Sequence, residues 1–371
     1  MNVLQQFRDV AADPKAYARQ WKKRSGGKVV GTLCSYAPEE LILAAGALGF
    51  RIVGGSGAIT KADAHLQAYS CSLVRGALED ALAGRLAFLD GIVFPHTCDS
   101  IQRLSDIWRM NAATGFHLDV VLPVKLDTES ARDYMAAVMR RARAELETLL
   151  ETTISEDDLR QAVTTCNAMR EKMKALYDLR QDRPGVIAGR DMYAITRAAM
   201  VMDRGEFLKG ITALVEEAGT AEAPAGPCKR ILLSGGVCNL PDIYSPIEAA
   251  GGAVIWDDLC TGARQLTGQV DTSGDLTQAI ARRYSDRAVC PAKHAGVRAR
   301  GEALVALARE TEAQGVVFLY LKFCDPHAFD YPYLKEMLAK AGIPSLLVEL
   351  EEQTASDGQF QTRCEAFVEM L

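Results

Sequence analysis

The sequence predicts an α/β protein of two similar parallel-sheet domains that a helical segment connects. Its 371 residues are enough for two domains, or three, at roughly 150 residues each. Short apolar strands alternate with helices in both halves of the chain, whereas the middle of the chain has helical periodicity alone. We therefore expect an N-terminal domain at 1–128, a helical connection at 129–218 and a C-terminal domain at 228–371.

The composition excludes several classes of protein. With 49% hydrophobic and 24% charged residues, the chain is typical of a soluble globular protein. Its net charge of −6 provides no basic stripe for a nucleic acid. The longest apolar run, 41–50, is far short of the roughly 20 residues that a membrane span needs. Because the N-terminal residues contain no apolar signal core, we expect a cytoplasmic protein with neither a nucleic-acid nor a membrane partner.

The first domain is expected to contain two strand–loop–helix–strand units. Its elements, in order, are a helix at 3–24, a strand at 28–33, a helix at 38–47, a strand at 50–53, a helix at 73–82, a strand at 88–94, a helix at 101–110 and a strand at 117–123. The helix that begins with Pro38, Glu39 and Glu40 has a typical N-terminus, because carboxylates are stabilised at the positive end of the helix dipole.

The rest of the chain continues this plan after a helical stretch. We expect a helix at 131–150, a second helix that Ser155 begins, a break at 184–185, a linker at 219–227, strands at 230–234, 253–256 and 344–349, a further strand that begins at Gly315 and ends before Cys324, and helices at 241–250 and 333–341. The segments around Cys238 and Cys324 repeat those around Cys34 and Cys98. This repetition indicates a duplicated Rossmann- or flavodoxin-like domain, although any two α/β domains share some of it.

Ten cysteines are the unusual feature of the composition, and no two are closer than ten residues. This spacing excludes the disulfide framework of a small secreted domain and the CxxC motifs of zinc and redox sites. Five of the cysteines follow directly after predicted strands: Cys34, Cys98, Cys238, Cys260 and Cys324. Because ligands bind at the carboxyl ends of strands in open α/β sheets, these thiols should face the cleft between the domains.

The other cysteines fall into two groups. Cys71 begins a predicted helix, where backbone N–H groups favour a thiolate. Three that lie on helix faces or in the linker are expected to be structural: Cys166, Cys228 and Cys364. Spacing alone leaves open whether the cleft cysteines are structural thiols, a reactive thiol or metal ligands.

A cleft with many thiols and few histidines suits an iron–sulfur cluster better than zinc or copper. The five histidines form no ligand pattern. His96 and His327, which lie beside Cys98 and Cys324, can be proton donors, partners of the metal ligands, or loop histidines in water. The glycine-rich run at 54–57 lacks dinucleotide-binding spacing and is expected to be a loop, and the chain has no P-loop motif.

Several strings, in order and over nearly the whole chain, resemble the 2-hydroxyacyl-CoA dehydratase / benzoyl-CoA reductase family. They are Cys34-Ser-Tyr-Ala-Pro-Glu-Glu-Leu-Ile42, Tyr69-Ser-Cys-Ser72, Asp90-Gly-Ile-Val-Phe94 with Thr97-Cys-Asp-Ser100, Asp257-Asp-Leu-Cys-Thr-Gly262, Lys322-Phe-Cys-Asp-Pro326, and Gln361-Thr-Arg363 with Glu365-Ala-Phe367. The length and the segment from Glu349 to Thr354 look more like the smaller dehydratase subunit than a reductase subunit.

The resemblance implies a 4Fe–4S cluster that three cysteines hold, with one iron left open. By motif position these are Cys71, Cys98 and Cys324, and Cys34 is a substitute or a neighbour. It also implies a subunit of an enzyme that dehydrates (R)-2-hydroxyacyl-CoA to enoyl-CoA through a ketyl radical. The implied partners are a homologous sibling subunit, in a heterodimer or a homodimer, and a separate iron–sulfur activator ATPase that supplies the electron.

Other interpretations stay open. Double-cubane cluster proteins, a sister branch that resembles an ATP-driven reductase of small molecules, hold an 8Fe–9S cluster. Six cysteines could supply its ligands: Cys34, Cys71, Cys98, Cys260, Cys290 and Cys324. A benzoyl-CoA-reductase-like activity is a further alternative. From other classes, the chain could be a non-catalytic two-domain binding module or a subunit that has lost its cluster.

Ser35, Tyr36 and Glu39 are expected at the mouth of the cleft, where a helix N-terminus could hold a carbonyl or hydroxyl group of a substrate. Ser35 and Glu39 are candidates for catalysis. His96 is a candidate proton donor. For Glu39, helix capping is the alternative role.

Overall fold

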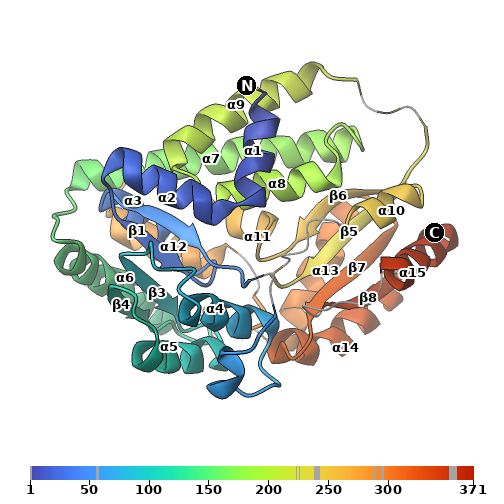
Figure 1. Cartoon of the computed structure of the whole chain (residues 1–371). Coiled ribbons are helices and arrows are strands. Elements are labelled where there is room, and N and C mark those ends of the chain that lie inside the picture. Colours follow the sequence, from blue (N-terminus) through green and yellow to red (C-terminus); the bar gives the residue numbers. More distant parts are fainter. Residues whose placement is uncertain are drawn as a thin grey trace.

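The computed structural model describes residues 2–55, 58–222, 224, 226–237, 243–287, 290–293, 296–350 and 357–371. Within these ranges the chain forms two four-stranded parallel sheets with helices packed around them (Figure 1). This arrangement confirms the predicted fold class. None of the described helices has an apolar stretch long enough to cross a membrane.

The N-terminal sheet has the strand order β2–β1–β3–β4, and all its strand pairs are parallel. Its strands are β1 (Val29–Thr32), β2 (Leu48–Arg51), β3 (Gly91–Pro95) and β4 (Phe116–Val120). β1 and β3 are buried at every position, as expected for central strands of a sheet that is covered on both faces.

The C-terminal sheet repeats this topology with the order β6–β5–β7–β8, again with parallel pairs. Its strands are β5 (Lys229–Gly235), β6 (Gly252–Asp258), β7 (Gly315–Leu321) and β8 (Ser345–Leu350). In both sheets the strand order reverses at the central pair, β1/β3 or β5/β7. A ligand is therefore expected beyond the carboxyl ends of these two pairs.

The prediction of a single helix at 3–24 is wrong in one respect, because the structure contains two helices in this range. α1 (Val3–Ala12) and α2 (Pro14–Ser25) are separated at Asp13, whose backbone is non-helical and whose side chain caps the second helix. Pro14 occupies the first turn of α2, since it has no N–H group to continue α1. Three further helices of this half are α3 (Glu39–Ala44), α4 (Ser72–Leu82) and α5 (Asp99–Asn111).

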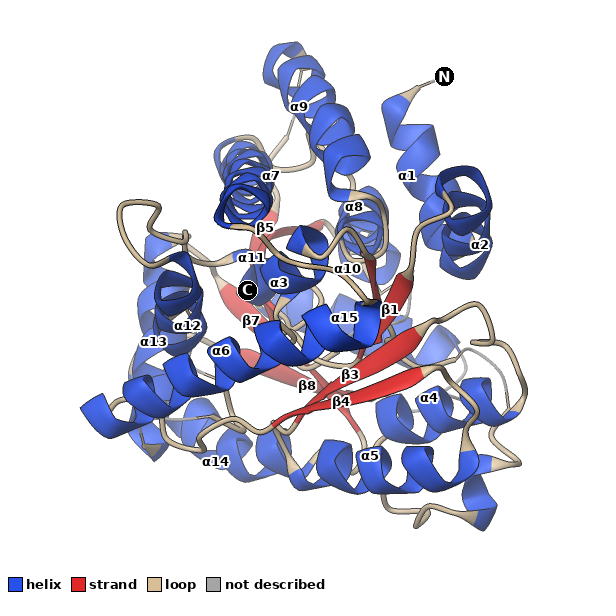
Figure 2. Ribbon diagram, turned by 90° about the vertical axis from the view of Figure 1, so that its left-hand side faces the viewer, coloured by secondary structure: helices blue, strands red, loops and turns tan. Residues whose placement is uncertain are grey.

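The middle of the chain is helical, as predicted. It forms α6 (Glu129–Leu150), α7 (Glu156–Asp182), α8 (Gly189–Ala199) and α9 (Arg204–Thr220). Ser155 and Asp158 form a capping box at the start of α7. Helices α7, α8 and α9 lie together with α1 on one side of the sheets, and α5 and α14 lie on the opposite side (Figures 1 and 2).

The C-terminal half contains α10 (Ser245–Ala249), α11 (Ala263–Leu266), α12 (Leu276–Asp286), α13 (Val297–Glu310), α14 (Asp325–Lys340) and α15 (Asp357–Met370). α14 begins eight residues earlier than the predicted helix at 333–341. The start of the helix predicted at 241–250, like Cys238, lies outside the described residues. Leu276 and Tyr284 of α12 share a buried core with Val30 and Met135 of the N-terminal half.

Candidate functional site

Three of the predicted cluster ligands occupy the same position in a helix. Cys71 is the N-cap residue of α4, Cys98 of α5 and Cys324 of α14. The first turn of a helix has unpaired N–H groups and a partial positive charge, both of which favour an anion. The three helix N-termini therefore provide positive potential at the positions where thiolate ligands would lie.

Electrostatic interactions connect six cysteines into one group. Cys34, Cys71 and Cys290 raise the pKa of Cys98. Cys71, Cys98 and Cys260 raise the pKa of Cys324, and Cys34 and Cys260 raise that of Cys290. Together these interactions link Cys34, Cys71, Cys98, Cys260, Cys290 and Cys324. They are the same six that the sequence offers for a larger cluster. We call them the thiol group.

Burial is the main influence on the pKa of four members of the thiol group: Cys71, Cys98, Cys290 and Cys324. It raises the pKa of Cys98 to about 12 and that of Cys290 to about 11, and neighbouring thiols add to the increase. N–H groups of the first helical turn act in the opposite direction, for example those of Val74 and Leu73 on Cys71, whose pKa still rises through burial. These thiols are therefore protonated at neutral pH unless a metal displaces the proton.

The donor chemistry of the thiol group fits an iron–sulfur cluster, whose usual protein ligands are cysteine thiolates. Among the described residues, no three histidine, cysteine or acidic side chains lie close enough together to hold a single ion. A cluster is larger than one ion, and its ligands bind different irons, so its thiolates need not meet at one point. Neighbouring thiols at helix N-termini, one buried (Cys71) and two partly buried (Cys98 and Cys324), are compatible with this requirement.

Four cationic side chains accompany the thiol group, and sequence reasoning missed all of them: Arg51, Arg264, Arg287 and Lys293. The guanidinium of Arg264 donates a hydrogen bond from Nη1 to Sγ of Cys260 at 3.1 Å, and its Nε donates to Asp258 at 2.9 Å. The Nη1 of Arg51 donates to the carbonyl of Cys260 at 2.6 Å.

The other two cations lie near the remaining thiols. The Arg287 guanidinium lies 4.6 Å from the ring centre of Tyr36 and donates to the hydroxyl of Ser35 at 3.1 Å. Lys293 is buried and donates to the carbonyl of His96 at 3.1 Å. Burial lowers the pKa of Lys293, while neighbouring thiols, Cys290 foremost, act to raise it. Such cations would offset the negative charge of a cluster with thiolate ligands.

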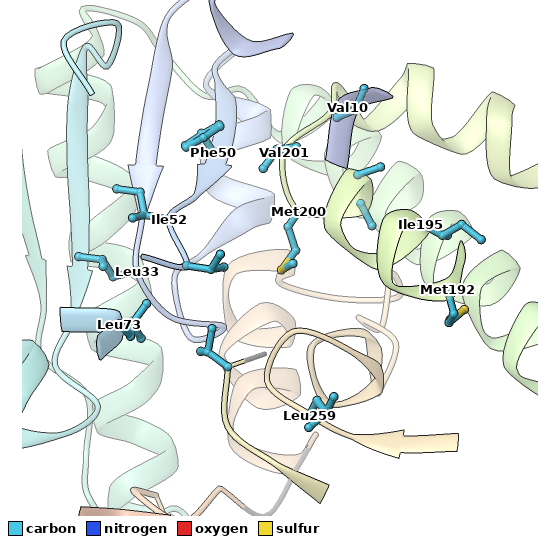
Figure 3. Close-up of a cluster of buried hydrophobic side chains, with 14 of the residues drawn as sticks. Val10, Leu33, Phe50, Ile52, Leu73, Met192, Ile195, Met200, Val201 and Leu259 are labelled. Atoms are coloured by element: carbon cyan, nitrogen blue, oxygen red, sulfur yellow. The ribbon is translucent and has the colours of Figure 1, made fainter. Parts of the chain in front are cut away.

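An apolar wall lies against the same segments. Leu33, Leu73 and Leu259 are close in sequence to Cys34, Cys71 and Cys260, and all three leucines are buried. Figure 3 shows these leucines in one cluster with side chains of β2 and α8. The site therefore has an apolar backing at these segments, and charges beside such a surface interact more strongly than in water.

The structure places the candidate Glu39 among arginines. Its carboxylate is 2.5 Å from Arg170 of α7 and 3.6 Å from Arg204 of α9. Burial alone would raise the pKa of Glu39, but these arginines and Arg283 lower it to about 2. Glu39 is thus an ionised carboxylate that connects α3 to the helical segment, and these contacts favour a structural role.

Ser35 and His96 line two different pockets. Ser35, with Cys34 and Glu39, lines a cavity of about 20 Å³, which is room for about one water molecule. His96, with Cys98, lines a pocket of about 610 Å³. That volume lies within the range of small-molecule sites, roughly 300–1,000 Å³. Nε2 of His96 is 2.9 Å from Oδ1 of Asp119.

His327 is a buried residue and not a loop histidine in water. Its side chain is 3% exposed, and in the described part of the chain neither ring nitrogen has a hydrogen-bond partner. Burial, followed by the charges of Arg300 and Arg264, lowers the pKa of His327 well below the usual value. The imidazole is therefore neutral. Its backbone N–H donates to the carbonyl of Cys324 at 3.1 Å.

Two of the three cysteines that we expect to be structural lie in helices. Cys166 on α7 and Cys364 on α15 are buried, and Cys228 is partly exposed just before β5. None of these three cysteines is among the main causes of the pKa shifts of Cys98, Cys290 and Cys324.

Comparisons with known proteins show the family of this chain. The family model described as "2-hydroxyglutaryl-CoA dehydratase, D-component" matches residues 34–371. The (R)-phenyllactyl-CoA dehydratase beta subunit of Clostridium sporogenes is 27% identical over 98% of this chain and 97% of its own. The lactoyl-CoA dehydratase beta subunit of Anaerotignum propionicum is 28% identical over 100% of this chain and 98% of its own. A benzoyl-CoA reductase subunit of Thauera aromatica is 28% identical over 93% of this chain and 90% of its own.

The matched region includes all ten cysteines, the whole C-terminal sheet and every strand of the N-terminal sheet except β1. Because the family model covers more than nine-tenths of the sequence, the similarity is not confined to one domain. The chain belongs to the family of the 2-hydroxyglutaryl-CoA dehydratase D-component.

Proposed function

We propose that this chain is the iron–sulfur subunit of an ATP-activated 2-hydroxyacyl-CoA dehydratase. The observation that carries the proposal is the position of Cys71, Cys98 and Cys324 at the N-termini of three helices, within one group of interacting thiols. Relatives over almost the whole length are beta subunits of dehydratases that are named for 2-hydroxyacyl-CoA thioesters.

In this proposal Cys71, Cys98 and Cys324 hold a 4Fe–4S cluster. When bound, the cluster supplies an electron at low potential and an iron that can act as a Lewis acid. Arg264 and Arg51 stabilise the negative charge at the Cys260 side of the group. The apolar wall at Leu33, Leu73 and Leu259 keeps water from that region.

The pocket of about 610 Å³ is the proposed position of the acyl part of the substrate, because Cys98 lines it. Phe329, which is 77% exposed, and Val124 provide apolar contact area there. His96 and Lys293 line the same pocket. Because Nε2 of His96 contacts Asp119, the other ring nitrogen, Nδ1, is the one that we propose to hold a proton for the hydroxide that leaves the substrate.

The proposal includes two partners. The relatives are named as beta subunits, so we propose a homologous sibling subunit beside this chain. Because the sequence contains no P-loop motif, ATP hydrolysis would take place on a separate iron–sulfur activator. That activator would donate the electron that starts the reaction.

A second candidate is a double-cubane reductase of small molecules. The specific observation in its favour is that Cys34 and Cys290 interact with Cys98, and Cys260 interacts with Cys324, so that all three contact a proposed ligand electrostatically. Six thiols in one group are more than a single cubane with an open iron needs. A benzoyl-CoA-reductase-like activity is a third possibility, and one relative is named as a subunit of that enzyme.

Anaerobic purification followed by iron and sulfide analysis tests these proposals. A single cubane predicts a brown protein with about four irons per chain, and a double cubane predicts about eight. Electron paramagnetic resonance of the reduced protein checks the type of cluster. A colourless protein that takes up no iron after anaerobic reconstitution would exclude both and favour a non-catalytic binding module.

The substrate is tested separately. The iron-loaded chain is mixed with candidate sibling and activator proteins, ATP and a panel of (R)-2-hydroxyacyl-CoA esters, and enoyl-CoA is measured. A dehydratase forms enoyl-CoA only with activator and ATP together. ATP-dependent reduction of a small molecule, without dehydration of any ester, would favour the double-cubane reductase.

A further inference from the structure

A second pocket, of about 510 Å³, lies away from the pocket beside Cys98 and has a basic lining. The ends of α1 and α2, one face of α8 and the loop after β2 surround it. Its polar lining includes Arg8, Lys15, Arg190, Arg197, Gly54 and Gly55. Arg190, Tyr193, Ala194 and Arg197 have the i, i+3, i+4, i+7 spacing of a single helical face, so α8 presents two of the four cations to the same cavity.

In the part of the chain that the structure describes, only two of the four cations of this pocket form ion pairs. Arg8 forms an ion pair with Asp191 at 2.7 Å, and Lys15 forms one with Asp80. Neither Arg190 nor Arg197 forms an ion pair with any described residue. Nη1 of Arg197 is buried and has no hydrogen-bond partner in that part of the chain.

A buried guanidinium group without a counter-ion is costly, because it loses hydration and gains no compensating contact. The one acidic side chain in the lining, Asp13, accepts a hydrogen bond from the N–H of Ala16 at 2.9 Å as the cap of α2. The pocket thus contains donors that fit an anion. The described residues place no carboxylate within ion-pair distance of Arg197, and the one carboxylate whose charge acts on it, Asp80, is paired with Lys15.

The two glycines add backbone to the wall. Gly54 has φ +88°, a conformation that favours glycine, and a Cβ at Gly55 would lie 2.7 Å from Oδ1 of Asp80. The first two residues of the loop predicted at 54–57 are therefore packed closely against Asp80 and α4; the last two lie outside the described residues. Gly54 also packs against the start of α4, directly after Cys71. A Cβ at Gly54 would lie 3.5 Å from Cα of Leu73.

We propose that this pocket binds the phosphate groups of an adenine nucleotide. Guanidinium groups form paired hydrogen bonds with phosphate oxygens, and Arg190 and Arg197 are available for them. The pocket volume is in the range of small-molecule sites. The nucleotide is either the CoA part of the substrate, which rests on the proposed function, or a free nucleotide.

Calorimetric titration of the anaerobically purified full chain tests the proposal. The probes are inorganic pyrophosphate, ADP and CoA at low ionic strength, and the variants are Arg197→Gln and Arg190→Gln. Each variant should weaken binding of all three probes by about tenfold or more, because each removes charged hydrogen bonds to phosphate. Arg298→Gln is the matched control, since Arg298 is exposed on α13 and its ion pair with Glu302 is a long one of 3.9 Å; its binding should equal that of the wild type.

Tighter binding of CoA than of ADP would identify the substrate thioester as the source, and equal or tighter binding of ADP would identify a free nucleotide. Absence of saturable binding to any probe would overturn the proposal, as would wild-type affinity in either variant. Arg190 is exposed, so Arg190→Gln keeps the test valid if Arg197→Gln does not fold. Repeating the titration with Cys98→Ser distinguishes the cluster from the phosphate site. A variant that loses iron but still binds phosphate would show that the two sites are independent.

Discussion

The Nη1 of Arg264 donates a hydrogen bond to Sγ of Cys260 at 3.1 Å. Although burial alone would lower it, the charges of Asp258 and Cys260 hold the pKa of Arg264 above its usual value. A permanent cation therefore lies against a thiol of the group that we propose to bind iron. Its charge should influence the chemistry of any cluster in that position.

Replacement of Arg264 by glutamine should make the cluster harder to reduce. Loss of a charged hydrogen bond near a thiol destabilises the more negative, reduced state, and we expect the reduction potential to fall by about 60 mV or more. Redox titration followed by electron paramagnetic resonance measures this change. Arg298→Gln is the control, and an unchanged potential in Arg264→Gln would show that Cys260 lies apart from the cluster.

Substitution of individual cysteines should separate the single cubane from the double cubane. Serine at Cys71, Cys98 or Cys324 should abolish the cluster under both proposals, because each thiol is a proposed ligand at a helix N-terminus. Serine at Cys290 should leave about four irons in a single-cubane protein and reduce the iron content of a double-cubane protein. Iron analysis of anaerobic samples gives the answer.

Cys228→Ser is the control for these variants, because Cys228 lies in the linker before β5 and is partly exposed. It should keep the full iron content. If Cys98→Ser also keeps it, the proposed ligand set is wrong.

The stability of the protein should decrease in acid because of Glu39. Its pKa is about 2 in the folded protein and 4.5 as the ordinary value, so the carboxylate stabilises the fold above pH 4.5. This contribution is lost as the pH falls from 4.5 towards about 2. Urea unfolding at several pH values should show a steeper decline for the wild type than for Glu39→Gln over this interval. Parallel curves for the two proteins would contradict the prediction.

Replacement of Arg170 by methionine should destabilise the fold. Its guanidinium is 1% exposed, contacts Glu40 and lies 2.5 Å from Glu39, so the variant leaves two buried carboxylates without their main partner. Breaking a buried ion pair in this way costs about 3–5 kcal/mol of unfolding free energy. Urea denaturation at neutral pH measures it. Arg298→Met, at an exposed position of α13, should change the free energy of unfolding little. A loss in Arg170→Met as small as that of this control would mean that other groups neutralise the two glutamates.

The alternation of apolar strands with helices was enough to predict two parallel-sheet domains, and the strand order confirms that class. Local rules also located specific ends. Ser155 caps α7, and Cys71 precedes α4. The helix at 3–24 was wrong because its apolar period continues through Asp13, where a cap and a proline interrupt it.

Other features depend on contacts between distant segments. The segment at 263–310 received no predicted elements, yet its helix α12 packs into the core beside Val30. Arg51 reaches the carbonyl of Cys260 from 209 residues away in sequence. Periodicity describes one segment at a time, so it cannot reveal which cation will be buried beside which thiol.

The sequence by itself determined the parallel-sheet architecture and the family, because strand and helix periods and short motifs are local properties of the chain. It also determined that cysteines follow strand ends, where open sheets bind ligands. Only the tertiary structure decided that six thiols interact, that His327 is buried and neutral, and that Arg197 lines a pocket with no ion-pair partner among the described residues. Burial and electrostatic interaction depend on distances between segments far apart in sequence, and these distances exist only after the two sheets and the helical segment have packed together.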